Sequence, residues 1–157
     1  MDKVLWCIRQ REGIKLVEPS QNLAQAYMKK AEDSLFSIRL NTVRDWKIST
    51  AYYAMYFSLY GIMMRLGVKC EIHSCTIEFA SQFLKEYFSD EEVNFLEDSL
   101  KSRIDAQYYV NRNVPDQQVE LMIKKAPDFH VKCKGILMKL NERKVEEIRG
   151  KLRSLIV

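Results

Sequence analysis

Residues 45–66 read DWKISTAYYAMYFSLYGIMMRL, and Gly67 follows them. Apolar and aromatic side chains fall on nearly every face of a helix built on this stretch, which is typical of a helix buried on all sides. Glycine readily takes the left-handed conformation that ends many helices. The most apolar part, residues 51–64, is well short of the ~20 residues needed to cross a bilayer. The sequence therefore predicts a central core helix that ends before Gly67.

Helical periodicity continues on both sides of this segment. Ser89, with Glu92 three residues later, forms the pattern of a capping box at a helix start. Pro127 must interrupt or kink a helix, because it lacks a backbone donor and crowds the preceding turn. We predict an all-α protein, an up-and-down bundle of four to five helices. Beside the central helix, apolar stripes at helical spacing cover residues 20–39, 74–87, 89–107, 119–140 and 141–157.

The first eighteen residues differ in composition from the rest of the chain. Residues 4–8 and 14–17 are rich in β-branched and aromatic side chains, and the charged residues 11–13 separate them. This pattern predicts a short N-terminal β-hairpin. We accordingly divide the chain into a hairpin extension, residues 1–18, and a helical bundle, residues 19–157.

Charge and cysteine content exclude little. The formal net charge of +4 permits nucleic-acid binding but lacks the dense basic stripe of a dedicated binder. The N-terminal residues lack the apolar core of a signal peptide, so we expect a cytoplasmic protein that does not associate with membranes. In that compartment the four cysteines, Cys7, Cys70, Cys75 and Cys133, are expected to be free thiols.

Motifs of the common enzyme classes are missing from the sequence. It has no glycine-rich phosphate loop, nucleophile elbow, zinc-protease helix or paired cysteine knuckles. With only two histidines, a Ser or Cys nucleophile with a His base requires a chance meeting in the folded chain. Cys70, His73 and Cys75 form a weak alternative metal site, since their spacing is irregular for zinc. We predict neither metal nor cofactor.

The aromatic residues of the central helix have two interpretations. Tyr53, Phe57 and Tyr60 share one side at core spacing, which favours packing over base stacking. Tyr52 and Tyr56 are expected to present their hydroxyl groups near a cleft or a subunit boundary.

The polar cluster near the end of the helix at 89–107 is more informative. Arg103 and Gln107 are one turn apart on a face next to Leu96 and Leu100, so a guanidinium lies close to the core. Such a group needs a polar partner or a cleft. Either an ion pair with Asp or Glu stabilises the bundle there, or Arg103 serves a ligand.

These residues resemble the HEPN family (higher eukaryotes and prokaryotes nucleotide-binding), chiefly its small stand-alone archaeal and bacterial members. The similar segments are residues 46–57, 69–73 and 103–108, and the likeness covers about residues 20–140. The resemblance implies a helical bundle that pairs as a homodimer through its longer helices.

The family includes metal-independent ribonucleases whose signature is an Arg, four to six residues and a His. Arg103 matches the Arg, but positions 108, 109 and 110 are Tyr, Tyr and Val. A tyrosine with an ordinary pKa near ~10 is a poor general base at neutral pH. The resemblance therefore favours a chain with little or no catalysis, with a ribonuclease using Arg103 and Tyr108 as the alternative.

Other members of the family act beside a minimal nucleotidyltransferase, as toxin and antitoxin or as a two-part module. By this resemblance we expect a homodimer that binds nucleotide or RNA phosphate and works with such a partner. A plain dimerisation scaffold remains a further alternative. The ligand-binding residues that the resemblance implies are Arg103, Asp105, Gln107, Tyr109, Asn111, Arg112, Tyr52 and Tyr56.

Overall fold

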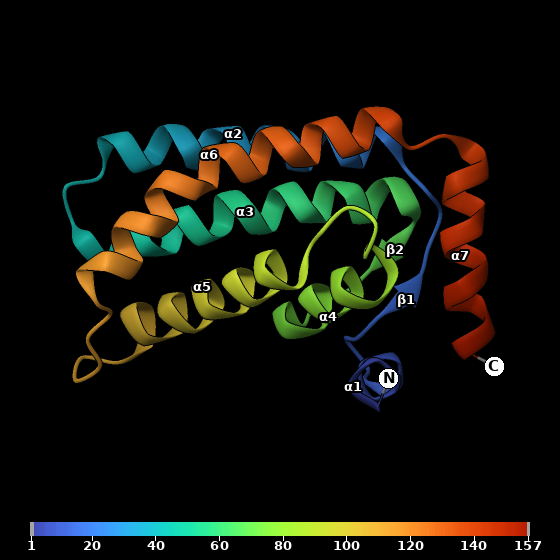
Figure 1. The fold of residues 1–157 in the computed structure, drawn as a ribbon, viewed down its shortest axis with the longest axis horizontal. Helices are drawn as coiled ribbons and strands as arrows, with labels where there is room; N and C mark the ends of the chain where they lie inside the picture. The colour runs from blue at the N-terminus through green and yellow to red at the C-terminus, as the bar shows by residue number, and fades with distance from the viewer. Residues whose placement is uncertain (1, 157) are drawn as a thin grey trace.

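A computed structural model describes residues 2–156 of the chain (Figure 1). Four long helices form the bundle, and shorter elements close its ends. The predicted all-α class is confirmed. In order, the elements are α1 (Asp2–Arg9), β1 (Lys15–Leu16), α2 (Gln21–Leu40), α3 (Arg44–Leu66), β2 (Val68–Lys69), α4 (His73–Phe83), α5 (Asp90–Tyr108), α6 (Asp116–Lys139) and α7 (Glu142–Ile156).

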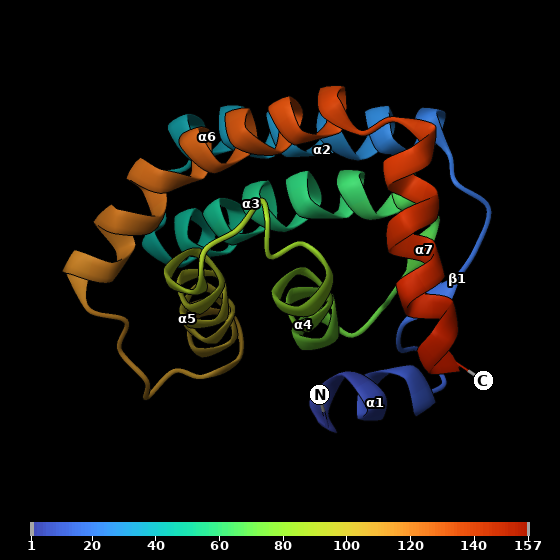
Figure 2. The ribbon, with the colours of Figure 1, turned by 45° about the vertical axis from the view of Figure 1, so that its right-hand side comes forward.

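Helix α3 lies at the centre of the molecule. It packs against α2, α5 and α6, and α7 crosses the end of the bundle where α3 finishes (Figures 1 and 2). Most side chains of α3 are buried, as its apolar composition predicts. Gly67 ends the helix with φ of 69°, and a Cβ there would lie 2.5 Å from the Val17 carbonyl oxygen. The predicted left-handed stop is confirmed, and only glycine fits it.

Local signals also place α5 and α6. The Ser89 hydroxyl accepts from the Glu92 backbone, and the Glu92 carboxylate accepts from the Ser89 backbone, so the predicted capping box is present. Helix α6 continues through Pro127. The helix expected over residues 74–87 is shorter than predicted, because α4 ends at Phe83 and a turn follows.

The N-terminal hairpin prediction is wrong in its first strand. Residues 4–8 belong to α1, which buries Val4 and Cys7 on one face. The second run does form a strand, β1, but it pairs antiparallel with β2, which follows α3. The spacing of Val4 and Cys7 suits a helix that covers the bundle, and this tertiary contact outweighs the β propensity of the run.

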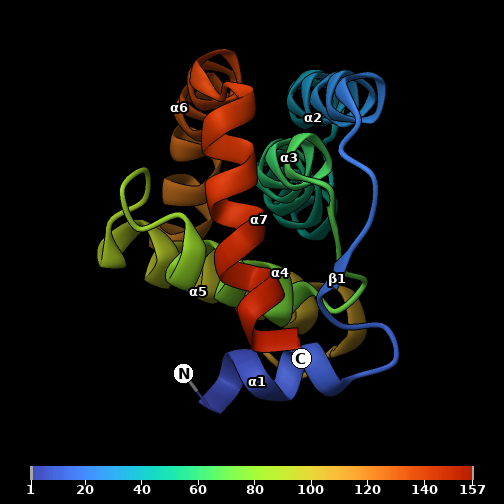
Figure 3. The same ribbon diagram turned by 90° about the vertical axis from the view of Figure 1, so that its right-hand side faces the viewer.

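The prediction of four free thiols is also wrong. Cys7 and Cys75 form a disulfide that joins α1 to α4, while Cys70 and Cys133 are free and buried. Figures 2 and 3 show α1 lying beneath α4. The bond depends on contact between segments far apart in sequence, which the even number of cysteines alone does not predict.

Within residues 2–156, no helix combines the length and the apolar character that a membrane span requires.

Candidate functional site: a buried arginine framed by aromatic rings

Arg103 lies in the last third of α5 and points toward the core. It is 8% exposed, so its guanidinium is largely withdrawn from water. Its Nη1 donates to the Tyr53 hydroxyl at 3.4 Å and to Gln107 Oε1 at 3.2 Å. Both partners are neutral. In the part of the chain that the structure describes, no carboxylate forms an ion pair with Arg103, and its buried Nε has no hydrogen-bond partner.

Aromatic rings surround this guanidinium. Its central carbon lies 5.4 Å from the ring centroids of both Tyr52 and Tyr53, and 5.9 Å from that of Tyr108. The faces of such rings carry partial negative charge and attract cations at these distances. The rings compensate the positive charge only in part, because an arginine stays ionised at any ordinary pH and a buried ion needs a counter-charge.

His73, the first residue of α4, belongs to the same cluster. Its Nδ1 shares a hydrogen bond of 2.8 Å with the Tyr52 hydroxyl. Its ring stacks on that of Tyr56, with centroids 4.0 Å apart and planes 5° apart. Burial, and then the positive charge of Arg103, lower the pKa of His73 to about 4. The imidazole is therefore neutral at physiological pH.

The tyrosines are placed differently from the sequence-based expectation. Tyr52 and Tyr56 lie in the core rather than at a cleft, and burial raises the pKa of both hydroxyls. Tyr53 and Phe57 are instead half-buried and line a shallow hollow. The reason is that α3 has neighbours on several sides, so its helical pattern could not indicate which face is covered. Tyr52 holds His73 and Arg103 from inside the core.

The weak metal alternative is wrong as a three-ligand set. The sulfur of Cys75 is bonded to Cys7, so it cannot ligate a metal as a thiolate. The Cys70 thiol donates to the Ile72 carbonyl, and burial raises its pKa. Among residues 2–156 there is no group of three potential metal ligands.

The segment after α5 forms the outer edge of the site. Asp105 and Arg112 pair at 3.1 Å, and the Arg112 guanidinium lies 3.6 Å from the centroid of the Tyr109 ring. A hollow of about 490 Å³ lies between this segment and the start of α3. Five of the predicted site residues line it, together with Arg44: Gln107, Tyr108, Tyr109, Asn111 and Arg112.

Comparison with known families identifies the family to which this chain belongs. A family model described as HEPN domain matches residues 22–136, well over half of the chain. The chain belongs to the HEPN family. No curated protein matches the sequence significantly. Membership supports a nucleotide- or RNA-related role in general. The matched segment begins after β1, so α1 and β1 lie outside it.

The HEPN signature explains why the sequence did not identify His73 as a neighbour of Arg103. A signature search looks for an imidazole on the same helix as Arg103, where Tyr108 stands instead. The structure brings an imidazole from α4, thirty positions earlier in the chain, to the Tyr52 ring over which Arg103 also lies. Its contact with Tyr52 depends on how α4 packs against α3, so no local spacing could have indicated it.

A second histidine constellation is present but is structural. Ser58 Oγ lies 2.8 Å from His130 Nδ1, and His130 Nε2 lies 3.4 Å from Glu32 Oε1. Ser58 is fully buried within α3 and its hydroxyl also donates to the Ala54 carbonyl. A substrate carbonyl could not reach this oxygen, so the group joins α2, α3 and α6 rather than forming a nucleophile.

Proposed function

We propose that this HEPN protein binds a phosphate group of a nucleotide or RNA through Arg103. The observation that carries the proposal is a buried guanidinium compensated only by neutral and aromatic groups. Such a site gains more from an incoming anion than an arginine already paired with a carboxylate, because the positive charge is already desolvated. A phosphate also accepts the parallel hydrogen bonds that a guanidinium offers.

The hollow after α5, which Arg103 itself does not line, would supply the rest of the ligand site. Gln107 and Tyr108 belong both to the Arg103 cluster and to the hollow. Asn111 offers an amide, and Arg112 offers a second guanidinium already oriented by Asp105. A nucleotide whose phosphate reaches Arg103 could thus place its base or sugar against Tyr108 and Asn111.

A homodimer is part of the proposal. Apolar side chains crowd one end of the bundle, at the α2–α3 turn and after α5. Phe36, Leu40 and Trp46 are each more than half exposed. Exposed apolar groups in such number favour a protein interface. Arg44, between Leu40 and Trp46, lines the same hollow as Tyr108, so a second copy docked here would border the ligand site.

The resemblance to two-part modules suggests the cellular context. We propose a minimal nucleotidyltransferase as the partner protein, in a toxin–antitoxin-like pair in the cytoplasm. Co-purification of such an enzyme with the tagged full chain is the expected result. Recovery of the homodimer alone under the same conditions would argue against this partner.

Removing the arginine tests the leading proposal. ATP, AMP or short single-stranded RNA is expected to raise the melting temperature of the wild-type protein. At about a hundred times its dissociation constant, the ligand adds about 2.7 kcal/mol to the free energy of unfolding. Arg103→Ala is expected to abolish this gain, because the phosphate loses its guanidinium. Arg143→Ala, at an exposed position on α7, is the matched control and should keep it. A dimer indifferent to every ligand would leave a dimerisation scaffold as the function.

His73 favours a second candidate, a metal-independent ribonuclease. The tautomer that donates Nδ1–H to Tyr52 leaves a lone pair on Nε2, which can accept the proton of an attacking 2′-hydroxyl. Arg103 can stabilise the charge that develops on the phosphate. At neutral pH an imidazole has a free lone pair, whereas a tyrosine hydroxyl must first lose its proton, so we place the base at His73 rather than at Tyr108.

This candidate predicts RNA cleavage in the presence of a chelator. His73→Gln and Arg103→Ala are each expected to lower the cleavage rate by about a hundredfold or more, as loss of a general base or of charge stabilisation does. Tyr108→Phe, which keeps the ring near Arg103, should retain most of the rate. Equal loss in the Tyr108 variant would transfer the role back to that hydroxyl, and no cleavage by the wild type would exclude the candidate.

A further inference from the structure

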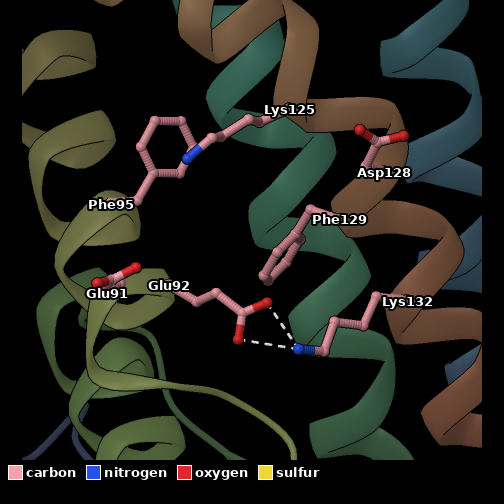
Figure 4. Close-up of a pocket in the computed structure, with 7 residues that line it drawn as sticks. All are labelled: Glu91, Glu92, Phe95, Lys125, Asp128, Phe129 and Lys132. Atoms are coloured by element: carbon pink, nitrogen blue, oxygen red, sulfur yellow. Dashed lines mark hydrogen bonds and ion pairs between the residues drawn. The ribbon is translucent and has the colours of Figure 1, made fainter.

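A separate hollow lies between the first half of α5 and the middle of α6. Its volume is about 310 Å³, at the small end of the range for ligand pockets. Figure 4 shows side chains from both helices directed into it, with α3 behind them. It is lined by Glu91, Glu92, Phe95, Lys125, Asp128, Phe129 and Lys132.

The sequence explains why the hollow exists. Pro127 stands within α6, between Lys125 and Phe129, and has no N–H to donate to the carbonyl four residues earlier. A proline at such a position bends a helix. Figure 1 shows α6 rising away from α5 along the bundle, although both helices pack against α3. Two helices that diverge from a common base leave a space that their side chains fill only in part.

Two phenyl rings form the apolar walls. Phe129 is 8% exposed and stacks on Phe88, with centroids 5.5 Å apart. Phe95 is partly buried on the α5 side. The protein already places a cation on one of these walls, since Lys125 Nζ is 4.6 Å from the Phe95 centroid. Lys132 Nζ is 5.4 Å from the centroid of Phe88, the ring on which Phe129 stacks. The ring faces thus act as partners for positive charge.

The three carboxylates of the hollow outnumber its two ammonium groups. Lys132 donates to both carboxylate oxygens of Glu92, at 2.6 and 2.8 Å. That carboxylate also accepts from the Ser89 backbone at 2.8 Å, which completes the cap of α5. Within residues 2–156, Glu91 and Asp128 form no ion pair or hydrogen bond through their carboxylates. Two free carboxylates therefore border the hollow, Glu91 from the α5 side and Asp128 from the α6 side, with the two phenyl rings between them (Figure 4).

We propose that this hollow binds a small planar organic cation, of the amidinium or guanidinium class. Such a cation can lie flat against a phenyl ring and donate in its own plane to a carboxylate. The proposal is independent of the phosphate site, which lies about 12 Å further along α5 at 1.5 Å per residue.

An anionic occupant does not fit the same lining. It would meet Glu91 and Asp128 at once. The Lys125 ammonium, which among residues 2–156 pairs with no carboxylate, would have to leave the Phe95 ring to meet the anion. The Lys132 ammonium would have to break its bonds to Glu92, which is also engaged in the cap of α5. A neutral aromatic molecule would fill the space but leave both carboxylates without a partner.

Matched probes test the charge requirement. Benzamidine, benzamide and benzoate have the same ring and nearly the same size, and differ in charge. In calorimetric titrations of the full chain we expect benzamidine to bind at least about tenfold more tightly than benzamide, and benzoate to show no binding, because one favourable ion contact is worth about a factor of ten. Equal binding of benzamide, or preference for benzoate, would overturn the proposal, as would no binding of benzamidine.

Variants locate the site and distinguish it from general attraction to acidic protein. Asp128→Asn combined with Glu91→Gln is expected to weaken benzamidine binding about tenfold. Lys125→Ala should instead strengthen it about fivefold, because the resident ammonium leaves the Phe95 ring. Glu120→Gln and Lys124→Ala, at exposed positions of α6 outside the hollow, should change nothing. Weaker binding in the Lys125 variant would contradict the proposed contact with Phe95.

Discussion

Replacing Cys7 and Cys75 together by serine is expected to lower the free energy of unfolding by about 4 kcal/mol. The disulfide joins residues 68 positions apart, and a bond that closes a loop of this length greatly restricts the unfolded chain. For a domain of this size the loss corresponds to a fall in melting temperature of roughly 8 to 16 °C. Urea unfolding of wild type and double variant measures the difference.

Reductant provides the matched control. Wild type treated with dithiothreitol should unfold like the double variant, whereas the double variant should not respond to the reagent. Under denaturing conditions without reductant, thiol titration of the wild type should detect only Cys70 and Cys133. Four titratable thiols, or a melting temperature that reductant leaves unchanged, would contradict the bond.

The same bond affects the candidate site. Cys75 lies in the first turn of α4, two residues after His73. The disulfide fixes this turn to α1, which packs beneath α4. Once it is broken, α1 retains few buried side chains, chiefly Val4 and Cys7, to hold it in place. Faster amide hydrogen exchange is therefore expected first in α1 and then in the start of α4.

The sequence predicted those elements whose signals are local. The central helix, its stop at Gly67 and the capping box of Ser89 and Glu92 each follow from neighbouring residues, and the structure confirms them. Arg103 was also found locally, because a guanidinium next to the apolar stripe of α5 requires explanation. Its surroundings are aromatic instead of acidic, which its own helix does not reveal.

The features that the sequence did not predict depend on contacts between distant segments. Residues 4–8 have β-forming side chains, yet they form a helix because that helix buries Val4 and Cys7 against α4. His73 stands beside two cysteines and in the HEPN-like segment 69–73, but neither feature predicts a place near Arg103. Its role depends on Tyr52, which lies a helix earlier, and on Arg103, which lies a helix later.

Acidification is expected to destabilise the protein through His73. Burial and Arg103 lower its pKa to about 4 in the folded state, from an ordinary value of 6.5. The folded state therefore holds the neutral imidazole, and its stabilising contribution is complete above about pH 6.5 and lost as the pH falls toward about 4. After allowance for partial exposure of the ring, the loss is about 2 kcal/mol. The His73→Gln variant has no imidazole at this position to titrate, so its free energy of unfolding should fall correspondingly less on acidification.

Urea unfolding between about pH 7 and pH 4.5 measures this difference. His130→Gln is the parallel variant, because burial also lowers the pKa of His130, while Glu32 opposes that shift. Each substitution should remove the part of the acid-induced loss of stability that its own histidine causes. If wild type and His73→Gln lose stability in parallel over this range, His73 is solvated and its contact with the Arg103 cluster is not present in solution.

Arg103→Ala connects this measurement to function. Because the guanidinium charge is one cause of the lowered pKa, its removal should raise the pKa of His73 and reduce the acid loss. A bound phosphate should act in the same direction, since it neutralises the guanidinium. A ligand that stabilises the wild type more at about pH 5 than at about pH 7 would then report phosphate bound beside both residues. Equal stabilisation at both pH values would place the ligand away from His73, and the cluster would act by holding Arg103 rather than by transferring a proton.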